Sequence, residues 1–259
     1  MLPAAKLRLQ AAILAITAAL LVMVPAIAGA DPNPKSWENW KTDFSKSNIP
    51  LSEVVSGGPP KDGIPAIDDP KFVAAGEAEL DDREPVIVFT HNEETKAYPL
   101  SVLMWHEIAN DRVGGHPFAV TYCPLCNAAI VFDAQLDGKR YDFGTTGRLR
   151  NSDLLMYDRQ TESWWQQFSG KAVIGALTGR KLKMMPSRLE AFGRFRERHG
   201  DAKVLVPNNP SLRDYGRNPY VAYDGRDAPY PLYTGTLPQD INPMARVVIV
   251  RQEGKQPWP

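Results

Sequence analysis

Short apolar runs separated by turn residues dominate the chain from residue 84 onward, and they predict strands. The runs 85–89, 118–122 and 154–157 are rich in β-branched and aromatic residues and have polar or turn-forming residues close by. Runs of this kind are typical of strands, and the Asp137-Gly138 pair between two β-rich stretches is a hairpin signal. The same pattern predicts further strands at 96–98, 163–166, 172–174, 181–184 and 246–250.

Two segments have helical spacing instead. The first, 99–110, places four apolar residues on one face, namely Leu100, Leu103, Met104 and Ile108. The second, 187–199, has Ser187 as its expected N-cap and apolar residues that would point inward at Leu189, Phe192 and Phe195. Between 206 and 243 the chain is rich in Pro, Asn, Tyr and Gly, which predicts a long ordered loop packed on the body.

The expected fold is therefore α+β and mostly β: a single domain of antiparallel hairpins with a few helices. The alternation of strand and helix that builds a thioredoxin fold is not evident in this order of elements. We expect three segments along the chain: a signal peptide (1–30), an extended N-terminal arm (31–70) and a core domain (71–259). Within the arm, Trp37 and Trp40 are expected to hold a short helix against the body.

The first thirty residues have the features of an export signal. Lys6 and Arg8 precede an apolar run at 11–24, which falls short of the about 20 residues that span a bilayer. Pro25 and the small residues 28–30 then match an A-x-A cleavage site. An uncleaved N-terminal anchor is the alternative. Cleavage would give a periplasmic or secreted protein with no stable membrane span, in an oxidising compartment.

Charge and missing motifs narrow the function classes. The chain has 30 basic and 30 acidic residues, so the basic excess that nucleic-acid binding usually needs is absent, and no nucleic-acid partner is expected. The sequence contains no G-x-S-x-G, no H-E-x-x-H and no glycine-rich phosphate loop. The sequence therefore carries none of these common hydrolase and nucleotide-binding signatures from which a function could be predicted.

The only two cysteines, Cys123 and Cys126, form the motif Y-C-P-L-C-N at 122–127. We expect the motif on a turn between strands, with a short helix over 127–135 as the alternative. A structural disulfide across so short a loop would stabilise the chain by about 2 kcal/mol, against about 4 kcal/mol or more for long loops. A staple is therefore one interpretation of the pair, and two chemical interpretations stand beside it.

The leading interpretation is thiol–disulfide chemistry with a thiol or disulfide partner protein. One cysteine would attack as a thiolate and the other would resolve the mixed disulfide. His106 is a candidate third catalytic residue, because a histidine near a dithiol can stabilise the thiolate or act as a base. A partly buried histidine bonded to the backbone is the alternative for His106.

The other chemical interpretation is a metal–thiolate site that binds zinc or copper(I). Cys123 and Cys126 would supply two ligands, and His106 is the first candidate for a third. Other candidates for zinc are His91, His116 and Asp153. Copper(I), which favours soft sulfur, could add Met104, Met156, Met184 or Met185.

A polar cluster interrupted by apolar residues follows the cysteines. As a ligand-binding wall it would use arginines for an anionic group and comprise Arg148, Arg150, Asn151, Asp153, Asp158, Arg159 and Trp164. The alternative is a network of ion pairs that also includes Glu162 and orients two hairpins. With a structural disulfide, this wall would make the protein a ligand-binding or scaffold module.

Several longer motifs carry a family resemblance. With Y-C-P-L-C-N at 122–127 stand F-G-T-T-G at 143–147 and N-S-D-L-L-M-Y-D-R-Q-T-E-S at 151–163. Shorter matching pieces are 62–65, 69–72, 105–107 and 242–247. By these motifs, which extend over about 63–250, the chain resembles the bacterial and archaeal domain-of-unknown-function family 3179. The resemblance implies one exported domain built around the cysteine turn, and it implies no particular reaction.

Overall fold

The computed structural model describes residue 37 and residues 39–247. The expected signal peptide, most of the expected short helix at Trp37 and positions 248–250 of the last expected strand lie outside these residues. Within them, no helix is long and apolar enough to cross a membrane.

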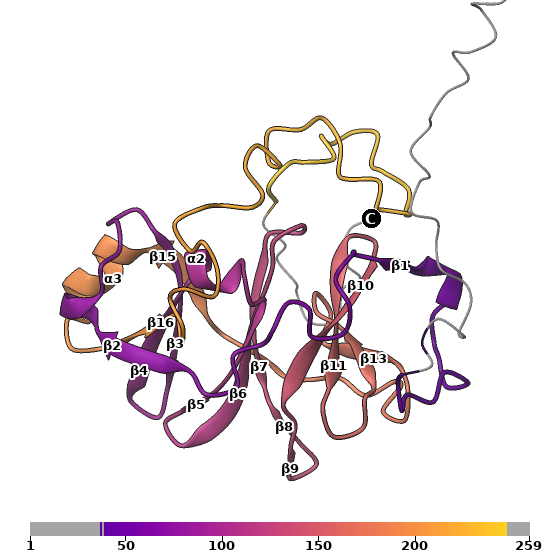
Figure 1. Cartoon of the computed structure of the whole chain (residues 1–259), viewed down its shortest axis with the longest axis horizontal. Coiled ribbons are helices and arrows are strands. Elements are labelled where there is room, and N and C mark those ends of the chain that lie inside the picture. The colour runs from indigo at the N-terminus through magenta and orange to yellow at the C-terminus, as the bar shows by residue number, and fades with distance from the viewer. Residues whose placement is uncertain (1–36, 38, 248–259) are drawn as a thin grey trace, which may run out of the picture.

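The described chain forms three larger sheets and one small hairpin (Figure 1). The first sheet has the order β1-β10-β11-β12-β13, with bounds Val54–Ser56, Phe143–Arg150, Asp153–Asp158, Trp164–Gln166 and Lys171–Ile174. The second has the order β14-β7-β6-β5, with bounds Met184–Met185, Ala128–Asp133, His116–Cys123 and Ile108–Val113. The third has the order β15-β3-β4-β16-β2, with bounds Arg188–Ala191, Pro85–His91, Glu94–Pro99, Lys203–Val206 and Lys71–Ala74.

The helical content is small. The helices are α2 (Leu100–Leu103) and α3 (Phe192–Arg198), with 3-10 turns at Leu51–Glu53 and Ala75–Glu77, and β8 (Gln135–Leu136) pairs with β9 (Lys139–Arg140). Neighbouring strands are antiparallel except β4 and β16, which come from distant parts of the chain. The predicted α+β, mostly β fold of antiparallel hairpins, distinct from a thioredoxin fold, is confirmed.

The sheet of β5, β6 and β7 lies between the other two, and both of its faces are buried (Figure 1). Because side chains alternate along a strand, β6 sends Val120 towards Phe89 of the third sheet and Ala119 and Cys123 towards Met156 of the first. Cys123 is therefore fixed at the end of a strand packed on both sides.

The first predicted helix, 99–110, is wrong beyond its first turn. The helix α2 ends at Leu103, and β5 begins at Ile108, which pairs with Thr121 of β6. The break is local, because Glu107 adopts a left-handed φ of 60° that a helix cannot contain. Pairing with β6 thus overrides the helical spacing of the apolar residues.

The second predicted helix, 187–199, is wrong in its first part. Arg188–Ala191 form β15 on the edge of β3, and the helix begins at Phe192. Leu189, expected to point inward, is 49% exposed, whereas Phe192 and Phe195 are buried as expected. Pairing of residues 188–191 with β3 thus outweighs the helical propensity of the first part of this segment.

The turn prediction for the cysteine motif is confirmed. Residues 124–127 form a turn, and the alternative helix over 127–135 is wrong because β7 occupies Ala128–Asp133. Residues 246 and 247 of the last expected strand are not in a strand. The predicted long loop is also confirmed: residues 207–247, here called the strap, contain no helix or strand and arch over the ends of β7 and β10 (Figure 1).

Candidate functional site at the cysteine turn

The cysteine motif lies at the end of the β6–β7 hairpin. Cys123 is the last residue of β6 and is 1% exposed, whereas Cys126 is partly buried. The turn is closed by the Asn127 N–H, which donates to the Pro124 carbonyl, and by the Tyr122 hydroxyl, which donates to Asn127 Oδ1 at 3.1 Å. Both cysteines are free thiols.

A second hairpin end, from a different sheet, meets this turn. Asn151 and Ser152 join β10 to β11 with φ values of 52° and 62°, the left-handed pair that tight two-residue hairpins require. The turn delivers Asp153 as the first residue of β11. The Cys123 thiol lies 3.6 Å from the Ser152 carbonyl oxygen, and the Cys126 thiol lies 3.4 Å from Asp153 Oδ1.

Three potential metal ligands therefore converge. The sulfur atoms of Cys123 and Cys126 and a carboxylate oxygen of Asp153 all lie within 4.8 Å of one another. The other oxygen of Asp153 accepts the Phe168 N–H at 3.0 Å, which fixes the orientation of the carboxylate. Two thiols and one carboxyl group can thus bind one ion without a rearrangement of the backbone.

Burial makes this group of acids costly to ionise. The pKa of Asp153 is raised from 3.8 to about 6 by burial, although the hydrogen bond from Phe168 acts in the opposite direction. The pKa of Cys126 is raised well above its ordinary value by hydrogen bonding with Cys123 and by burial. The site alone therefore favours a protonated thiol at Cys126.

Glu107 adds a second buried carboxyl group near Asp153. It is 7% exposed, and its pKa is raised from 4.5 to about 8 by burial and by the charge of Asp153. Its backbone carbonyl accepts the Tyr122 N–H at 2.8 Å, which ties it to the strand that carries Cys123. Within the described chain, no hydrogen bond reaches its carboxyl group.

Two buried polar atoms beside the turn also have no hydrogen-bond partner in the described chain: Ser152 Oγ and Gln167 Oε1. The amide nitrogen of Gln167 donates to Thr121 and to the Ala128 carbonyl, so its side chain is packed beneath the cysteine turn. Unsatisfied buried groups are rare in native proteins, and these two atoms belong to a set of seven that is spread over the described chain.

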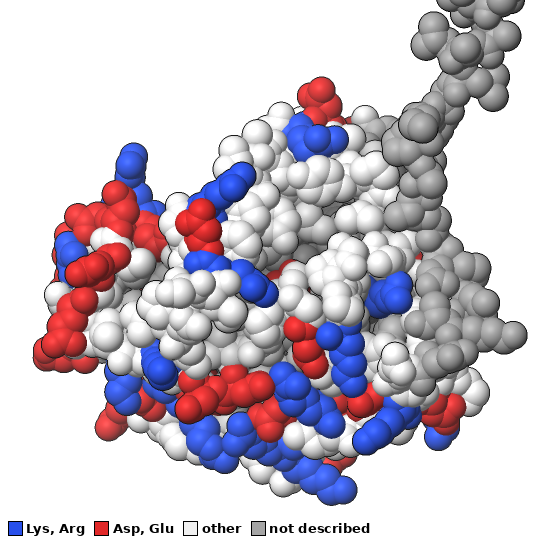
Figure 2. Space-filling model, viewed as in Figure 1, with Lys and Arg blue, Asp and Glu red and all other residues white. Residues whose placement is uncertain are grey.

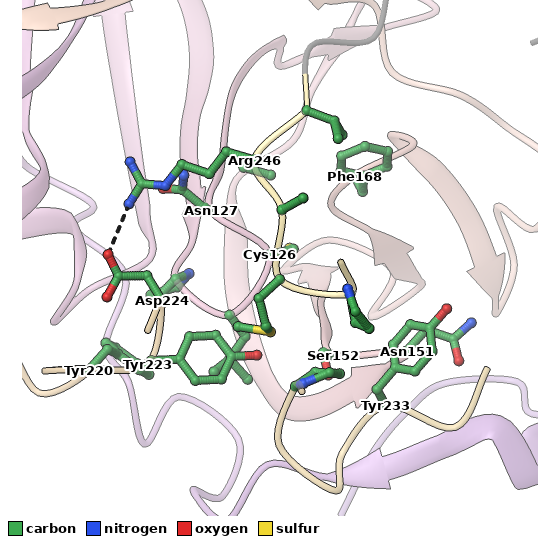
Figure 3. Close-up of a pocket in the computed structure, with 18 of the residues that line it drawn as sticks. Cys126, Asn127, Asn151, Ser152, Phe168, Tyr220, Tyr223, Asp224, Tyr233 and Arg246 are labelled. Carbon is green, nitrogen blue, oxygen red and sulfur yellow. Dashed lines mark hydrogen bonds and ion pairs between the residues drawn. The ribbon is translucent and has the colours of Figure 1, made fainter. Parts of the chain in front are cut away.

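The strap covers this region, and a partly open cavity of about 460 Å³ lies between the strap and the hairpin ends (Figure 3). Cys126, Asn127, Asn151 and Ser152 contribute the hairpin side of the cavity. Tyr220, Tyr223 and Tyr233 come from the strap, and Arg246 and Asp224 form an ion pair of 3.4 Å. Cys126 is thus accessible from the cavity, whereas Cys123 lies behind it.

His106 is held by contacts outside the cysteine cluster. Its Nδ1 donates to the Pro65 carbonyl at 2.7 Å, and its Nε2 lies 2.8 Å from the Tyr215 hydroxyl. Burial lowers its pKa, so a neutral ring accepts the Tyr215 proton at Nε2. The structure does not bring His106 into the group of ligand atoms that contains the cysteines.

The other candidate metal ligands are scattered, with two exceptions. Asp153 joins the cysteines, and Met104 lines the cavity. The rings of His91 and His116 contact each other and Phe118 in tilted and edge-on arrangements, at the far end of β6 from the cysteines. Met156 is in the core, and Met184 and Met185 form β14.

The expected ligand-binding wall is also divided. Only Asn151 and Asp153 lie at the cysteine site. Arg150 binds Glu53 and Gln166, Arg159 pairs with Asp62 and Asp68, and Asp158 accepts the Trp165 indole N–H. Arg148 lies over the Trp37 ring, and Trp164 is fully buried among Trp37, Trp40 and Phe44.

Glu107, Ser152 and Gln167 lie at the site but are not among the residues that the sequence predicts for it. Glu107 belongs to the motif at 105–107, but the expected helix hid its turn position. The signal for Ser152 was the Asn-Ser pair between two strand-like runs, which predicts a tight turn next to Asp153.

A family model described as "Protein of unknown function (DUF3179)" matches residues 61–258. Neither the curated proteins nor the solved structures contain a match to the chain.

Proposed function

The chain belongs to the DUF3179 family, and we propose that it is a metal-binding protein in which Cys123, Cys126 and Asp153 hold one divalent cation such as zinc. The observation that carries this proposal is the convergence of the three ligand atoms within 4.8 Å. The ligands come from two hairpin ends in two sheets, so they are positioned by the packing of the whole core. Thiolate and carboxylate groups are ordinary zinc ligands.

The electrostatics of the site support a cation. None of the hydrogen bonds and ion pairs found for Cys123, Cys126, Asp153 and the Glu107 carboxyl group in the described chain comes from a Lys or Arg side chain. A bound divalent ion reverses the local pKa pattern, because it stabilises thiolates and carboxylates that burial alone disfavours. Ser152 Oγ, buried and unpaired in the described chain, could then donate to a thiolate sulfur.

The donor set favours zinc over copper(I). A carboxylate oxygen beside two sulfurs suits a borderline ion, whereas copper(I) prefers thiolate and thioether sulfur. Two thioethers line the cavity, Met104, which was an expected candidate, and Met244, which was not. Three protein ligands also leave one position for water or another molecule, which is typical of catalytic rather than structural zinc sites.

Metal analysis of the purified, reduced protein tests the proposal. We expect about one zinc per chain, and a loss of most of it in Cys126→Ser and in Asp153→Asn. Asp133→Asn is the matched control, because Asp133 pairs with His116 away from the site and should keep the metal. Wild-type protein that is folded, reduced and metal-free after growth with zinc and dialysis against it would contradict the proposal.

Thiol–disulfide exchange is the second candidate, and the spacing of two free thiols on one turn favours it. A disulfide needs the two sulfurs at about 2.05 Å, and in this structure they lie within 4.8 Å of each other. The environment weakens this candidate, because the pKa of Cys126 is raised and a nucleophilic cysteine needs a lowered one. The test is exchange with a small disulfide at neutral pH: rapid exchange that Cys123→Ser abolishes would favour redox function over metal binding.

We also propose that the protein is exported to the periplasm or secreted, from the charged, apolar and small-residue segments at the N-terminus. The mass of the protein isolated from its native compartment tests this. Cleavage after Ala28 or Ala30 is expected, and a full-length cytosolic chain would contradict it.

A further inference from the structure

The cavity under the strap has the properties of a small-molecule site. We infer that it binds an organic ligand with a flat, apolar body and one metal-binding group. This inference rests on the proposed metal centre and names the class of ligand that the centre takes.

The size of the cavity fits a small molecule. Its volume of about 460 Å³ lies within the roughly 300–1,000 Å³ of typical ligand pockets. The hairpin ends form one side and the strap forms the other, so a ligand would lie between two walls of a partly open cavity (Figure 3).

The walls favour a flat apolar body. Phe168 faces the cavity from the first sheet, and Tyr220, Tyr223 and Tyr233 face it from the strap (Figure 3). Leu125, Leu237 and several prolines complete the lining. Aromatic rings pack against planar ligands with large contact areas, and prolines and leucines add no charge.

The charges of the lining exclude a highly charged ligand. Asp224 and Arg246 are the only charged residues among the described lining residues, and they pair with each other. Their side chains are 72% and 73% exposed, which places them at the rim (Figure 2 shows the charged side chains on one face of the molecule). A neutral or singly anionic molecule therefore fits the interior better than a nucleotide or a polyphosphate.

The position of the cysteines determines from which side a ligand can reach the metal. Cys126 and Ser152 line the cavity, and Cys123 does not. A metal held by Cys126 and Asp153 is therefore reached from the cavity side, where its fourth position would be open. A ligand whose apolar body contacts the aromatic walls can place its metal-binding group at that position, and zinc can expand to five ligands if the group chelates.

A matched pair of hydroxamates tests the inference on the zinc-loaded protein. Benzohydroxamate and acetohydroxamate carry the same metal-binding group and differ in the aromatic ring. We expect calorimetry to show at least about tenfold tighter binding of benzohydroxamate, with the zinc content unchanged after titration. Phe168→Ala and Tyr233→Ala should reduce the difference to about threefold or less, and Tyr215→Ala, a strap residue that does not line the cavity, should retain it.

The outcomes separate the two proposals. Equal affinity of the two hydroxamates for zinc-loaded protein would overturn the aromatic pocket and leave the metal centre intact. A preference for benzohydroxamate that persists in Phe168→Ala and Tyr233→Ala would place the aromatic contact elsewhere. This result would also overturn the aromatic pocket. Reduced, folded protein that binds no zinc would overturn both proposals.

Discussion

Two buried polar clusters in this protein handle charge in opposite ways. In the first, the Lys96 ammonium group contacts both oxygens of Asp111 at 3.1 and 2.9 Å and donates to the Arg112 carbonyl, and the Tyr98 hydroxyl donates to Asp111. In the second, the described chain provides two thiols and the carboxyl groups of Asp153 and Glu107 without an internal cation. The first cluster carries its own counter-ion, and the second has the composition of a site that takes one from solution.

The contrast shows how to separate structural from functional polar groups. A buried charge is tolerated when it is paired and hydrogen-bonded. Lys96 and Asp111 meet that condition with groups from β4 of the third sheet and β5 of the second. The cysteine cluster does not, and it is also the cluster that adjoins a cavity.

The largest expected effect comes from removing the internal cation of the first cluster. Lys96→Met should lower the free energy of unfolding by about 3–5 kcal/mol, because it leaves Asp111 buried without its partner. Denaturant unfolding measures this. Lys203→Met is the control: Lys203 is 56% exposed in its pair with Glu94, so its loss should cost about 1 kcal/mol or less. Equal effects of the two changes would contradict the claim that buried Asp111 depends on its internal cation.

Metal addition should stabilise the second cluster and leave the first untouched. At a free zinc concentration one hundred times the Kd, the free energy of unfolding should rise by about 2.7 kcal/mol. Cys126→Ser should abolish this gain, and Lys96→Met should retain it despite its lower baseline. A rise in Tm with zinc that persists in Cys126→Ser would place the metal elsewhere.

The pH dependence of the metal-free protein sharpens the comparison further. The pKa values of Asp153 and Glu107 are raised to about 6 and about 8, so the folded state binds their protons more tightly than the unfolded state. Their contribution to stability is therefore complete below about pH 4 and is lost as the pH rises towards 8. We expect a decrease of about 2 kcal/mol or more, since one unit of pKa shift corresponds to about 1.4 kcal/mol.

Glu107→Gln is the variant that tests whether Glu107 causes this decrease of the free energy of unfolding with pH. It should flatten the part of the stability profile between about pH 6 and 8, because the amide does not ionise. Unfolding curves collected in a metal chelator at several pH values check this. A slope that is unchanged in Glu107→Gln would mean that Glu107 does not titrate in this range.

The smallest expected effect concerns Ser152. Ser152→Ala removes a hydroxyl group that makes no hydrogen bond in the described chain, so the metal-free stability should change by less than about 1 kcal/mol. Zinc affinity should nevertheless fall by up to about tenfold if the hydroxyl donates to a bound thiolate. Competition with a coloured chelator measures the affinity, and an unchanged value would remove Ser152 from the site.

Local patterns in the sequence predicted the parts of the fold that short-range chemistry decides. The turn at 124–127, the hairpin at Asp137-Gly138 and the irregular strap follow from turn residues and apolar runs. The helix over 99–110 failed because Glu107 takes a left-handed conformation and Ile108 pairs with β6. Neither fact is encoded in the spacing of the apolar residues.

The site was predictable only in part for the same reason. The cysteine pair was evident from its motif, and Asp153 was named among several candidates without a reason to choose it. What selects Asp153 is the packing of the β10–β11 hairpin against the end of β6, a contact between two sheets. Sequence spacing also could not show that both ring nitrogens of His106 are engaged by Pro65 and Tyr215.

A cobalt(II) titration of the reduced protein tests the central claim most directly, because thiolate–cobalt charge-transfer absorption reports the ligand type and the stoichiometry together. We predict an absorption that saturates at about one cobalt per chain, disappears in Cys126→Ser, shifts in Asp153→Asn and is displaced by zinc. A protein with two titratable thiols and intact fold that develops no such absorption would contradict the assignment of Cys123, Cys126 and Asp153 as a metal centre.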